Sequence, residues 1–243
     1  MDLTNGGKNK SSQTQTKSRQ PAPKVCAERV YAFTPAFAWY TDNVLFGEIY
    51  ERTELPQRDR SLIVVASLIT LGRMPQLKGH FNRGLTYGIR PTEIAEIVTH
   101  LAFYSGWPCS MSAVEVMQEV FTARNIGTDQ IAQSTSEGLP MPADEVETTR
   151  KAGAIAPAFG ELTERVLQGD LWKRSELTPR DRSLVTIASL VAQGQMDQLG
   201  DHVKLGLKNG LTKTEIVEAV LHLAFYVGWP KAASAFPVVK AAF

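Results

Sequence analysis

The most constraining feature of this chain of 243 residues is an internal duplication. Shifting the sequence by about 122 positions aligns two long segments without a gap, and roughly 32 of the 59 positions from Leu55 to Ala113 are identical in the two copies. Shared helical patterning alone does not produce that much identity. Because the period is far longer than the roughly 20 to 50 residues of a solenoid repeat, we expect each copy to form a compact helical subdomain and the pair to form a pseudo-symmetric dimer on one chain. We expect each copy to need the apolar faces of the other.

Hydrophobic periodicity predicts the same helices in both copies, and no segment shows convincing strand alternation. The expected helices span 58–70 and 180–192, then 76–87 and 198–209, and then a third pair that begins near positions 91 and 213. Thr178 fits a helix N-cap, and Thr212 with Glu215 forms a capping-box pattern. Gly72 and Gly194 are expected to end the first pair of helices. The predicted fold class is all-α, with two tandem helical repeats.

Composition shifts predict the boundaries of the copies. The first residues are polar and carry no apolar run that could serve as a signal-peptide core or span a bilayer. A stretch after Thr122 is rich in Gly, Ser and Pro with little apolar periodicity, which is typical of a connector. We therefore expect a disordered tail over 1–27, a first repeat over 28–121, a linker over 122–149 and a second repeat over 150–243.

The charge and cysteine content narrow the possible partners. A formal net charge of +1 gives no field of either sign, which argues against a nucleic-acid or membrane-surface binder. Only Cys26 and Cys109 occur, too few for a disulfide framework or a four-cysteine zinc site. We expect a small-molecule ligand and a reducing, cytoplasmic setting.

Each copy contains the same ordered set of motifs. The string Leu-x-x-Arg-Asp-Arg-Ser-Leu precedes Gln-Leu-x-x-His, Glu-Ile-x-Glu and His-Leu-Ala-Phe-Tyr-x-Gly-Trp-Pro. The combination resembles the carboxymuconolactone decarboxylase family and covers 35–113 and 157–235, including the preceding segment 46–50 and its counterpart. The resemblance implies the helical fold shared with alkylhydroperoxidase-D-type proteins. It also implies an assembly of three or six subunits, for which a fused pair suits a homotrimer that imitates a hexamer.

The related peroxidases carry Cys-x-x-Cys-x-x-x-His, and both copies depart from that pattern. Counting back from His80, the cysteine positions hold Arg73 and Gln76; counting back from His202, they hold Gln195 and Gln198. Thiol-disulfide chemistry needs a nucleophilic thiolate and a resolving thiol. The sequence therefore excludes that peroxidase mechanism.

All four histidines occupy paired repeat positions, His80 with His202 and His100 with His222. His80 and His202 lie where the resemblance places the active-site histidine, and imidazole is suited to proton transfer near neutral pH. The alternative is a partly buried histidine that ties two helices together. We expect the catalytic role.

Glu96 and His100, like Glu218 and His222, are four residues apart on one helix face. Such a carboxylate could orient the imidazole and raise its pKa. The same spacing could hold half a metal site, but no nearby Cys or Asp completes a ligand pattern. We therefore expect a catalytic or structural pair, no metal and no other cofactor.

The remaining predicted site residues would contact substrate. An arginine fork can bind a substrate carboxylate or form an ion pair with a neighbouring helix, a tyrosine hydroxyl can reach a substrate oxygen or face a partner helix, and a tryptophan can line a pocket or anchor a helix corner. For tryptophan we favour packing. In the family the segment before the first core helix approaches the cavity, so its paired acids are secondary members of the set. The set is Arg60, Arg182, Tyr104, Tyr226, Trp107, Trp229, Glu48 and Asp170.

The resemblance implies a cofactor-free decarboxylase of a carboxylated lactone similar to 4-carboxymuconolactone, an intermediate of aromatic acid catabolism. Its chemistry needs a stabilised enolate oxygen and one proton. Two alternatives remain open: a lactone or enol isomerase, cyclase or hydrolase that uses the same groups, and a ligand-binding oligomer without enzymatic activity.

Overall fold

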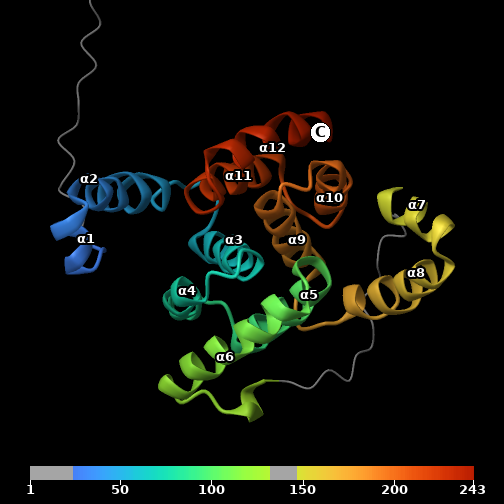
Figure 1. The fold of residues 1–243 in the computed structure, drawn as a ribbon, viewed down its shortest axis with the longest axis horizontal. Coiled ribbons are helices and arrows are strands. Elements are labelled where there is room, and N and C mark those ends of the chain that lie inside the picture. The colour runs from blue at the N-terminus through green and yellow to red at the C-terminus, as the bar shows by residue number, and fades with distance from the viewer. Residues whose placement is uncertain (1–23, 132–146) are drawn as a thin grey trace, which may run out of the picture. The chain divides into compact units, whose positions relative to one another are not determined.

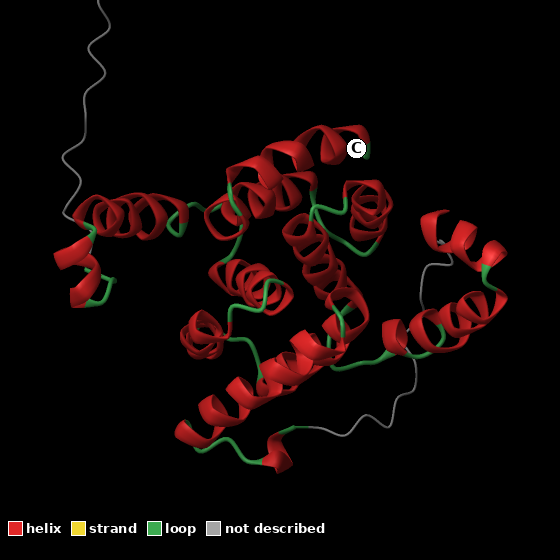
Figure 2. Ribbon diagram, in the orientation of Figure 1, coloured by secondary structure: helices red, strands yellow, loops and turns green. Residues whose placement is uncertain are grey.

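The computed structural model describes residues 24–131 and 147–243, and within them every regular element is a helix, as Figure 2 shows. The expected all-α fold is confirmed. Most of the predicted tail and the middle of the predicted linker lie outside the described residues, so those boundaries stay predictions. The chain divides into two compact units, Met1–Glu51 and Arg52–Phe243.

The first unit contains α1 (Glu28–Phe33), α2 (Pro35–Trp39) and η1 (Tyr40–Ile49), which is a π-helix. Asp42 holds this unit together, because its buried carboxylate accepts hydrogen bonds from the Tyr31 hydroxyl at 2.8 Å and from the Val25 backbone N–H at 2.9 Å.

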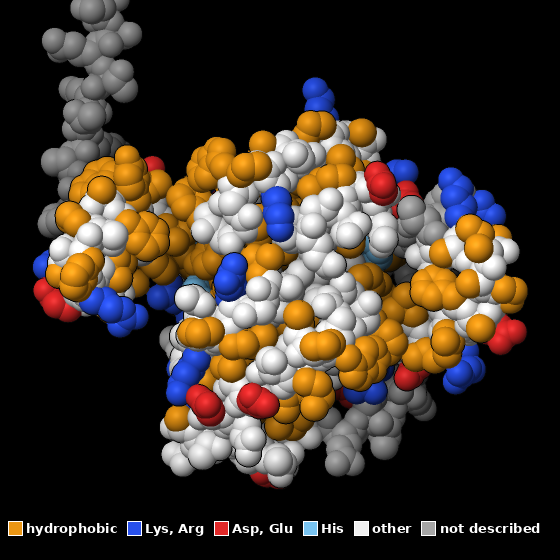
Figure 3. All heavy atoms as spheres, viewed as in Figure 1, with side chains coloured by type: hydrophobic (Ala, Val, Ile, Leu, Met, Phe, Trp, Pro, Cys, Tyr) orange, Lys and Arg blue, Asp and Glu red, His pale blue; other side chains and the backbone are white. Residues whose placement is uncertain are grey.

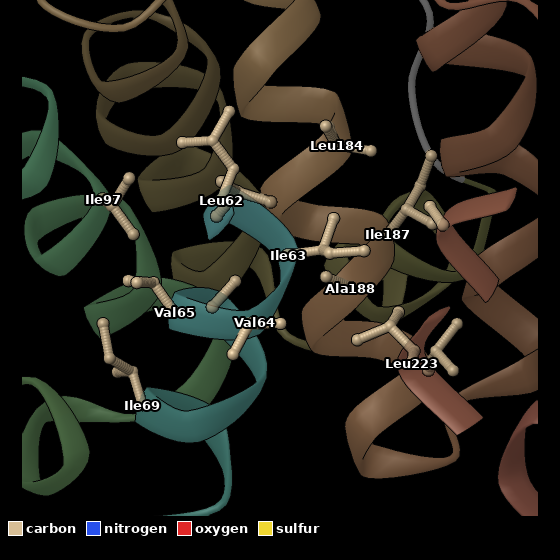
Figure 4. Close-up of a cluster of buried hydrophobic side chains, with 14 of the residues drawn as sticks. Leu62, Ile63, Val64, Val65, Ile69, Ile97, Leu184, Ile187, Ala188 and Leu223 are labelled. Atoms are coloured by element: carbon tan, nitrogen blue, oxygen red, sulfur yellow. The ribbon is translucent and has the colours of Figure 1, made fainter. Parts of the chain in front are cut away.

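At the centre of the second unit, α3 (Gln57–Thr70) packs along α9 (Pro179–Gln193), its counterpart in the other copy. Both helices were predicted, and nearly every residue from Asp59 to Ile69 is buried. Such all-round burial explains why their sequences are apolar with few polar positions. Figure 4 shows side chains of the two helices meeting, with Leu62 and Ile63 near Leu184 and Ile187.

Three further helices of each copy surround this central pair. They are α4 (Met74–Thr86), α5 (Pro91–Ser105) and α6 (Trp107–Ala123) in the first copy, and α10 (Met196–Lys208), α11 (Lys213–Val227) and α12 (Trp229–Ala241) in the second. The third helices cross over: α5 packs against α9 and α11 packs against α3 (Figure 1).

Because of this crossing, the two copies share one hydrophobic core, which agrees with the expectation that each copy needs the apolar faces of the other. The buried cluster contains Val65 and Ile97 of the first copy together with Ala188 and Leu223 of the second. Neither copy could bury its apolar faces alone. The expected pseudo-symmetric pairing therefore takes the form of a single interlocked unit.

The helix ends follow the predicted capping chemistry. The Thr178 hydroxyl accepts a hydrogen bond from the Asp181 backbone N–H, and Thr212 with Glu215 forms the reciprocal capping box. Gly106 and its counterpart Gly228 have φ of 91° and 94°, a backbone conformation that residues with a Cβ rarely adopt. Each of these glycines turns the chain sharply so that a Trp-Pro pair can begin the next helix.

A helical arm precedes the core of the second copy. It consists of α7 (Glu147–Ile155), α8 (Pro157–Leu162), the π-helix η3 (Thr163–Gln168) and the 3₁₀ turn η4 (Leu171–Lys173). In the first copy a short 3₁₀ turn, η2 (Thr128–Gln130), follows α6. Gly153 on α7 and Gly160 on α8 face each other so closely that a Cβ on Gly153 would lie 3.1 Å from the Gly160 Cα.

The surface agrees with the nearly neutral composition. On the face of the second unit that Figure 3 shows, Lys and Arg side chains are scattered among Asp and Glu rather than gathered into one patch. Within 24–131 and 147–243, no helix combines the length and the apolar character that crossing a membrane requires.

Candidate functional site

A cavity of about 310 Å³ lies in the second unit between the helical arm, α9, α10 and the C-terminal end of α5. This volume is at the lower end of the roughly 300–1,000 Å³ that is typical of small-molecule sites. The described lining residues are Phe103, Tyr104, Thr149, Ala152, Phe159, Leu167, Gln168, Trp172, Leu190, Gln193, Gln195, Gln198, His202 and Leu205.

His202 is positioned in the cavity by α10. On this helix Leu199 and Val203 are fully buried against the core, and Gly206 allows a close approach, because a Cβ there would lie 2.9 Å from a Leu211 side-chain carbon. The His202 ring stacks on Trp172 with centroids 6.2 Å apart. Burial thus fixes the helix, and the helix carries His202 to the cavity wall.

The His202 imidazole is neutral in the free site. Burial lowers its pKa from 6.5 to about 4, although the neighbouring Asp201 carboxylate acts in the opposite direction. Its Nδ1 atom is buried and has no hydrogen-bond partner among the described residues. A buried nitrogen without a partner is costly, and a ligand in the cavity could satisfy it.

Tyr104 provides a hydroxyl in the same cavity. Its oxygen accepts a hydrogen bond from the Trp172 indole N–H at 2.8 Å, and its ring lies edge-on to His202 with centroids 5.6 Å apart. Burial raises the pKa of Tyr104, so the hydroxyl keeps its proton. Because the oxygen acts as the acceptor toward Trp172, that proton can be donated to a ligand oxygen.

A buried ion pair supports this wall from behind. Arg182, which is fully buried, donates from Nη2 to Glu96 Oε1 at 2.6 Å, and its Nη1 lies 3.4 Å from His100 Nδ1. Arg174 donates from Nε to both oxygens of Glu96, at 2.9 and 3.0 Å. Of the two roles considered for this arginine, substrate binding and an ion pair with a neighbouring helix, the contacts of Arg182 fit the ion pair. Arg182 is not among the described lining residues of the cavity.

The geometry determines the tautomer of His100. A guanidinium can only donate, so the Nδ1 atom that faces Arg182 must accept. The hydroxyl of Thr186 donates to the Arg182 backbone carbonyl at 2.8 Å, so it accepts from His100 Nε2, also at 2.8 Å. His100 is therefore neutral, with its proton on Nε2.

The predicted direct pairing of Glu96 with His100 is wrong. The Arg182 guanidinium from the other copy stands between them, and burial together with that positive charge lowers the pKa of His100 instead of raising it. The same arrangement recurs in the counterpart: Arg60 donates to Glu218 at 2.8 Å and lies 3.1 Å from His222 Nδ1.

The repeat-related cluster contains the corresponding Arg, Glu, Tyr and two His side chains. His80 lies edge-on to Tyr226 at 5.3 Å, and Tyr226 stacks on His222 at 5.5 Å. Burial, assisted by Arg83, lowers the pKa of His80 to about 4; burial, assisted by Arg60, lowers that of His222 to about 3. In both clusters the histidine on α4 or α10, which is His80 or His202, comes from one copy. The Glu, the second His and the Tyr come from the other copy.

Four other predicted residues are not among the described lining residues. Trp107 and Trp229 are 58% and 62% exposed and contact Phe103 and Phe225 at the helix corners, so they are less buried than the packing role implies. Asp170 is exposed at the start of η4. Glu48 belongs to the first unit. Among the described residues no group of three His, Cys, Asp or Glu side chains could hold a metal ion.

Of the described lining residues, only Tyr104 and His202 were predicted from the sequence; those missed include Trp172, Gln193, Gln195 and Gln198. A signal existed for two of them, because Gln195 and Gln198 stand at the positions of the peroxidase cysteines, seven and four residues before His202. Residues four apart share a helix face, which brings Gln198 to the side of α10 that carries His202.

Comparisons with known proteins identify the family of the chain. The model of the carboxymuconolactone decarboxylase family matches residues 35–119 and 157–241. The chain is 30% identical over 104 residues to 4-carboxymuconolactone decarboxylase from Acinetobacter baylyi, which covers 43% of this chain and 78% of that protein. It is 38% identical over 80 residues to nitrosuccinic acid decarboxylase from Metarhizium robertsii, which covers 33% of this chain and 56% of that protein.

Both of these relatives are decarboxylases by name, so the expected enzyme class, a carboxy-lyase, is confirmed at the level of the class. The two matched regions coincide with the two copies of the duplication. With both copies matched, the chain belongs to the carboxymuconolactone decarboxylase family.

Proposed function

We propose that this protein removes carbon dioxide from a small carboxylated lactone similar to 4-carboxymuconolactone, and that the cavity at His202 is a site of this reaction. The observation that carries the proposal is the pairing of a buried, unpartnered imidazole nitrogen with a tyrosine hydroxyl in one cavity of about 310 Å³. These are the two groups that the reaction needs, a proton carrier and a donor to a developing oxyanion.

The names of the two relatives support the substrate class. A carboxylated butenolide and nitrosuccinic acid both place a carboxylate so that its loss leaves an electron pair delocalised onto oxygen, as a dienolate or as a nitronate. The protein then has to stabilise that oxygen and supply one proton to carbon. This requirement is the same for both acids.

In the proposed reaction the bond between the carboxyl carbon and the ring carbon breaks, and carbon dioxide leaves. The electron pair moves through the ring double bond onto the lactone carbonyl oxygen, to which the Tyr104 hydroxyl donates a hydrogen bond. The His202 imidazolium gives its proton to carbon, and the imidazole takes another proton from solvent. One proton is consumed for each carbon dioxide released.

The low pKa of His202 in the free site fits this cycle. Without substrate the imidazole is neutral, so no charge has to be buried in the cavity. A substrate carboxylate bound beside the ring raises the pKa of His202, so the ring takes up a proton when the substrate binds. Arg182, Glu96 and His100 act from behind the wall, where they hold the Tyr104 side of the cavity.

The test is to follow carbon dioxide release and ultraviolet absorbance with carboxymuconolactone as substrate. The His202→Gln variant should lose roughly 10²- to 10⁴-fold of the turnover at its own cavity, which is the usual contribution of general acid catalysis. The matched variant His80→Gln measures how much of the total turnover depends on the cluster at His80. The double variant should be inactive. Full turnover in the double variant would contradict the assignment of the proton donor.

We also propose that the chain assembles as a homo-oligomer, with a trimer as the first expectation. Large apolar side chains stand exposed at matching positions of both copies, notably Trp107 with Trp229 and Phe37 with Phe159. A monomer rarely leaves so many aromatic rings in water. Light scattering coupled to size exclusion measures the mass directly, and a monomeric mass would contradict this proposal.

A further inference from the structure

We infer that the cavity at His202 selects acids with a single carboxylate, the one that is lost, and that Gln195 at its mouth sets this preference. The inference rests on the proposed function and narrows its substrate class. It separates this chain from its two relatives, because nitrosuccinic acid and 4-carboxymuconolactone both carry a second carboxylate.

The lining of the cavity, as far as the structure describes it, carries no formal charge. No Lys, Arg, Asp or Glu is among its described lining residues, and His202 is neutral there. Besides hydroxyl and ring N–H groups, the polar lining consists of four amides, from Gln168, Gln193, Gln195 and Gln198. Arg150 and Lys151, next to the lining residues of α7, are not part of the wall.

Arg182, the buried cation behind the wall, does not line the cavity, although its Nε has no hydrogen-bond partner among the described residues. Arg182 is fully buried and already donates to Glu96, to the Arg174 carbonyl at 2.8 Å and toward His100. If the guanidinium turned toward the cavity, the buried Glu96 carboxylate would lose one of its two positively charged partners, and a buried charge without its partner is costly. The cavity therefore presents hydrogen-bond donors without a positive charge.

Such a wall treats the two carboxylates of a diacid differently. A carboxylate is poorly solvated among neutral side chains, but the one that leaves becomes neutral carbon dioxide, so its poor solvation is relieved as the reaction proceeds. A second carboxylate keeps its charge throughout, so its desolvation is never recovered. A substrate whose remaining part is uncharged avoids that loss.

Gln195 is one of two lining positions at which the copies differ in charge, the other being Leu205, whose counterpart is Arg83. The counterpart of Gln195 is Arg73, and both residues are N-caps, of α10 and α4 respectively. Their backbone angles nearly coincide, with φ and ψ of −84° and 69° for Gln195 and −90° and 61° for Arg73. The substitution Gln195→Arg therefore places a cation at the mouth of the cavity on a backbone that accommodates arginine in the other copy.

The experiment compares two substrates that differ in one charge: 4-carboxymuconolactone and its analogue in which the side-chain carboxylate is an amide. We expect the wild-type protein to have the higher kcat/KM for the amide. Gln195→Arg should shift the ratio of the two kcat/KM values toward the diacid by roughly tenfold, the usual effect of one charge-assisted hydrogen bond. The shift should shrink as salt is added, because Gln195 is exposed.

Gln195→Met is the matched control, because it removes the amide and adds no charge. It should not move the ratio toward the diacid. A wild-type preference for the diacid, or a ratio that Gln195→Arg leaves unchanged, would overturn the inference.

A binding measurement separates this inference from the proposed function. If neither acid releases carbon dioxide, the proposed function fails, and calorimetry with the same two acids still gives their Kd ratio in wild type and in Gln195→Arg. If the wild-type protein binds the amide more tightly than the diacid, and Gln195→Arg shifts the Kd ratio toward the diacid, the proposed selection by charge is supported even without turnover. Equal affinities, or no binding of either acid, would remove it.

Discussion

Thr186 shows how one hydroxyl distinguishes the two otherwise similar clusters. Its oxygen accepts from His100 Nε2 at 2.8 Å inside the protein, whereas the same position in the first copy is Val64, which cannot accept. The contact fixes the ring that stacks on Tyr104 with centroids 4.8 Å apart. A cavity-lining side chain is therefore held in place by a residue that does not itself line the cavity.

Replacing Thr186 with Val keeps the side-chain shape and removes the acceptor of a buried N–H. We expect the free energy of unfolding to fall by about 1–3 kcal/mol, the usual cost of leaving a buried donor without a partner. Ser61→Ala is the control, because the buried Ser61 hydroxyl bonds only to the Gln57 carbonyl on its own helix. Urea unfolding of the two variants measures both effects, and equal losses would contradict the role given to Thr186.

At the scale of elements, one ion pair joins the helical arm to the core. Arg174 follows η4 directly and binds Glu96 on α5 through both carboxylate oxygens. Trp172, two residues earlier, is a wall of the cavity and stacks on His202. The position of η4, and with it this wall of the cavity, therefore depends on a contact between the two copies.

The duplication supplies a matched pair of variants for this contact. Arg52 binds Glu218 at 2.7 and 2.9 Å just as Arg174 binds Glu96, and both arginines are partly exposed. Arg174→Gln and Arg52→Gln should therefore lower stability by similar amounts, about 1 kcal/mol each. Ligand affinity at the His202 cavity should fall only with Arg174→Gln. Calorimetry measures the two affinities. Equal affinities of the two variants would contradict the claim that the contact between Arg174 and Glu96 positions this wall of the cavity.

The helices and their ends were predictable from the sequence because local rules determine them. Apolar periodicity located α3, α4, α5 and their counterparts, and the caps at Thr178 and Thr212 formed as capping chemistry requires. Periodicity identifies the face that is buried and leaves open which helix covers it. The crossing of α5 onto α9 and of α11 onto α3 was therefore not visible.

The same limit explains the error at Glu96. Within one helix the spacing of four residues pairs Glu96 with His100, but the guanidinium of Arg182 arrives from the other copy and carries a full charge. A charged partner competes better for a buried carboxylate than a neutral imidazole does. Gln168 and Gln193 were missed for a related reason, since an amide side chain has no spacing signature of its own.

Across the whole molecule, the two copies exchange charged partners as well as apolar faces. Arg58 donates to Asp181 at 2.9 Å, and Arg180 donates to Asp59 at 2.6 Å, so the N-terminal ends of the two central helices are tied reciprocally. Together with the shared core, these pairs imply that the unit from Arg52 to Phe243 unfolds cooperatively. Its stability then reports on all four histidines at once.

That stability should depend on pH in a defined window. All four histidines have a lowered pKa in the folded protein, to about 4 for His80 and His202 and to about 3 for His222, because burial disfavours the charged ring. In the unfolded chain the pKa is about 6.5. Above pH 6.5 both states are neutral and the histidines have no effect. As the pH falls from 6.5 toward 4, the unfolded chain takes up protons that the folded protein does not, so the free energy of unfolding decreases.

Urea unfolding at pH 7.5, 6 and 5 measures this decrease. Below about pH 5 a further loss is added by Glu215 and Glu218, because burial opposes ionisation less than their hydrogen-bond and arginine partners favour it and the pKa of each is lowered in the folded protein. Each neutral buried histidine adds one proton to the uptake, or about 1.4 kcal/mol per pH unit well below pH 6.5. His202→Gln should therefore reduce the slope near pH 5 by about one proton. An unchanged slope in that variant would mean that His202 is already protonated in the folded protein, and the coupled entry of substrate and proton would have to be abandoned.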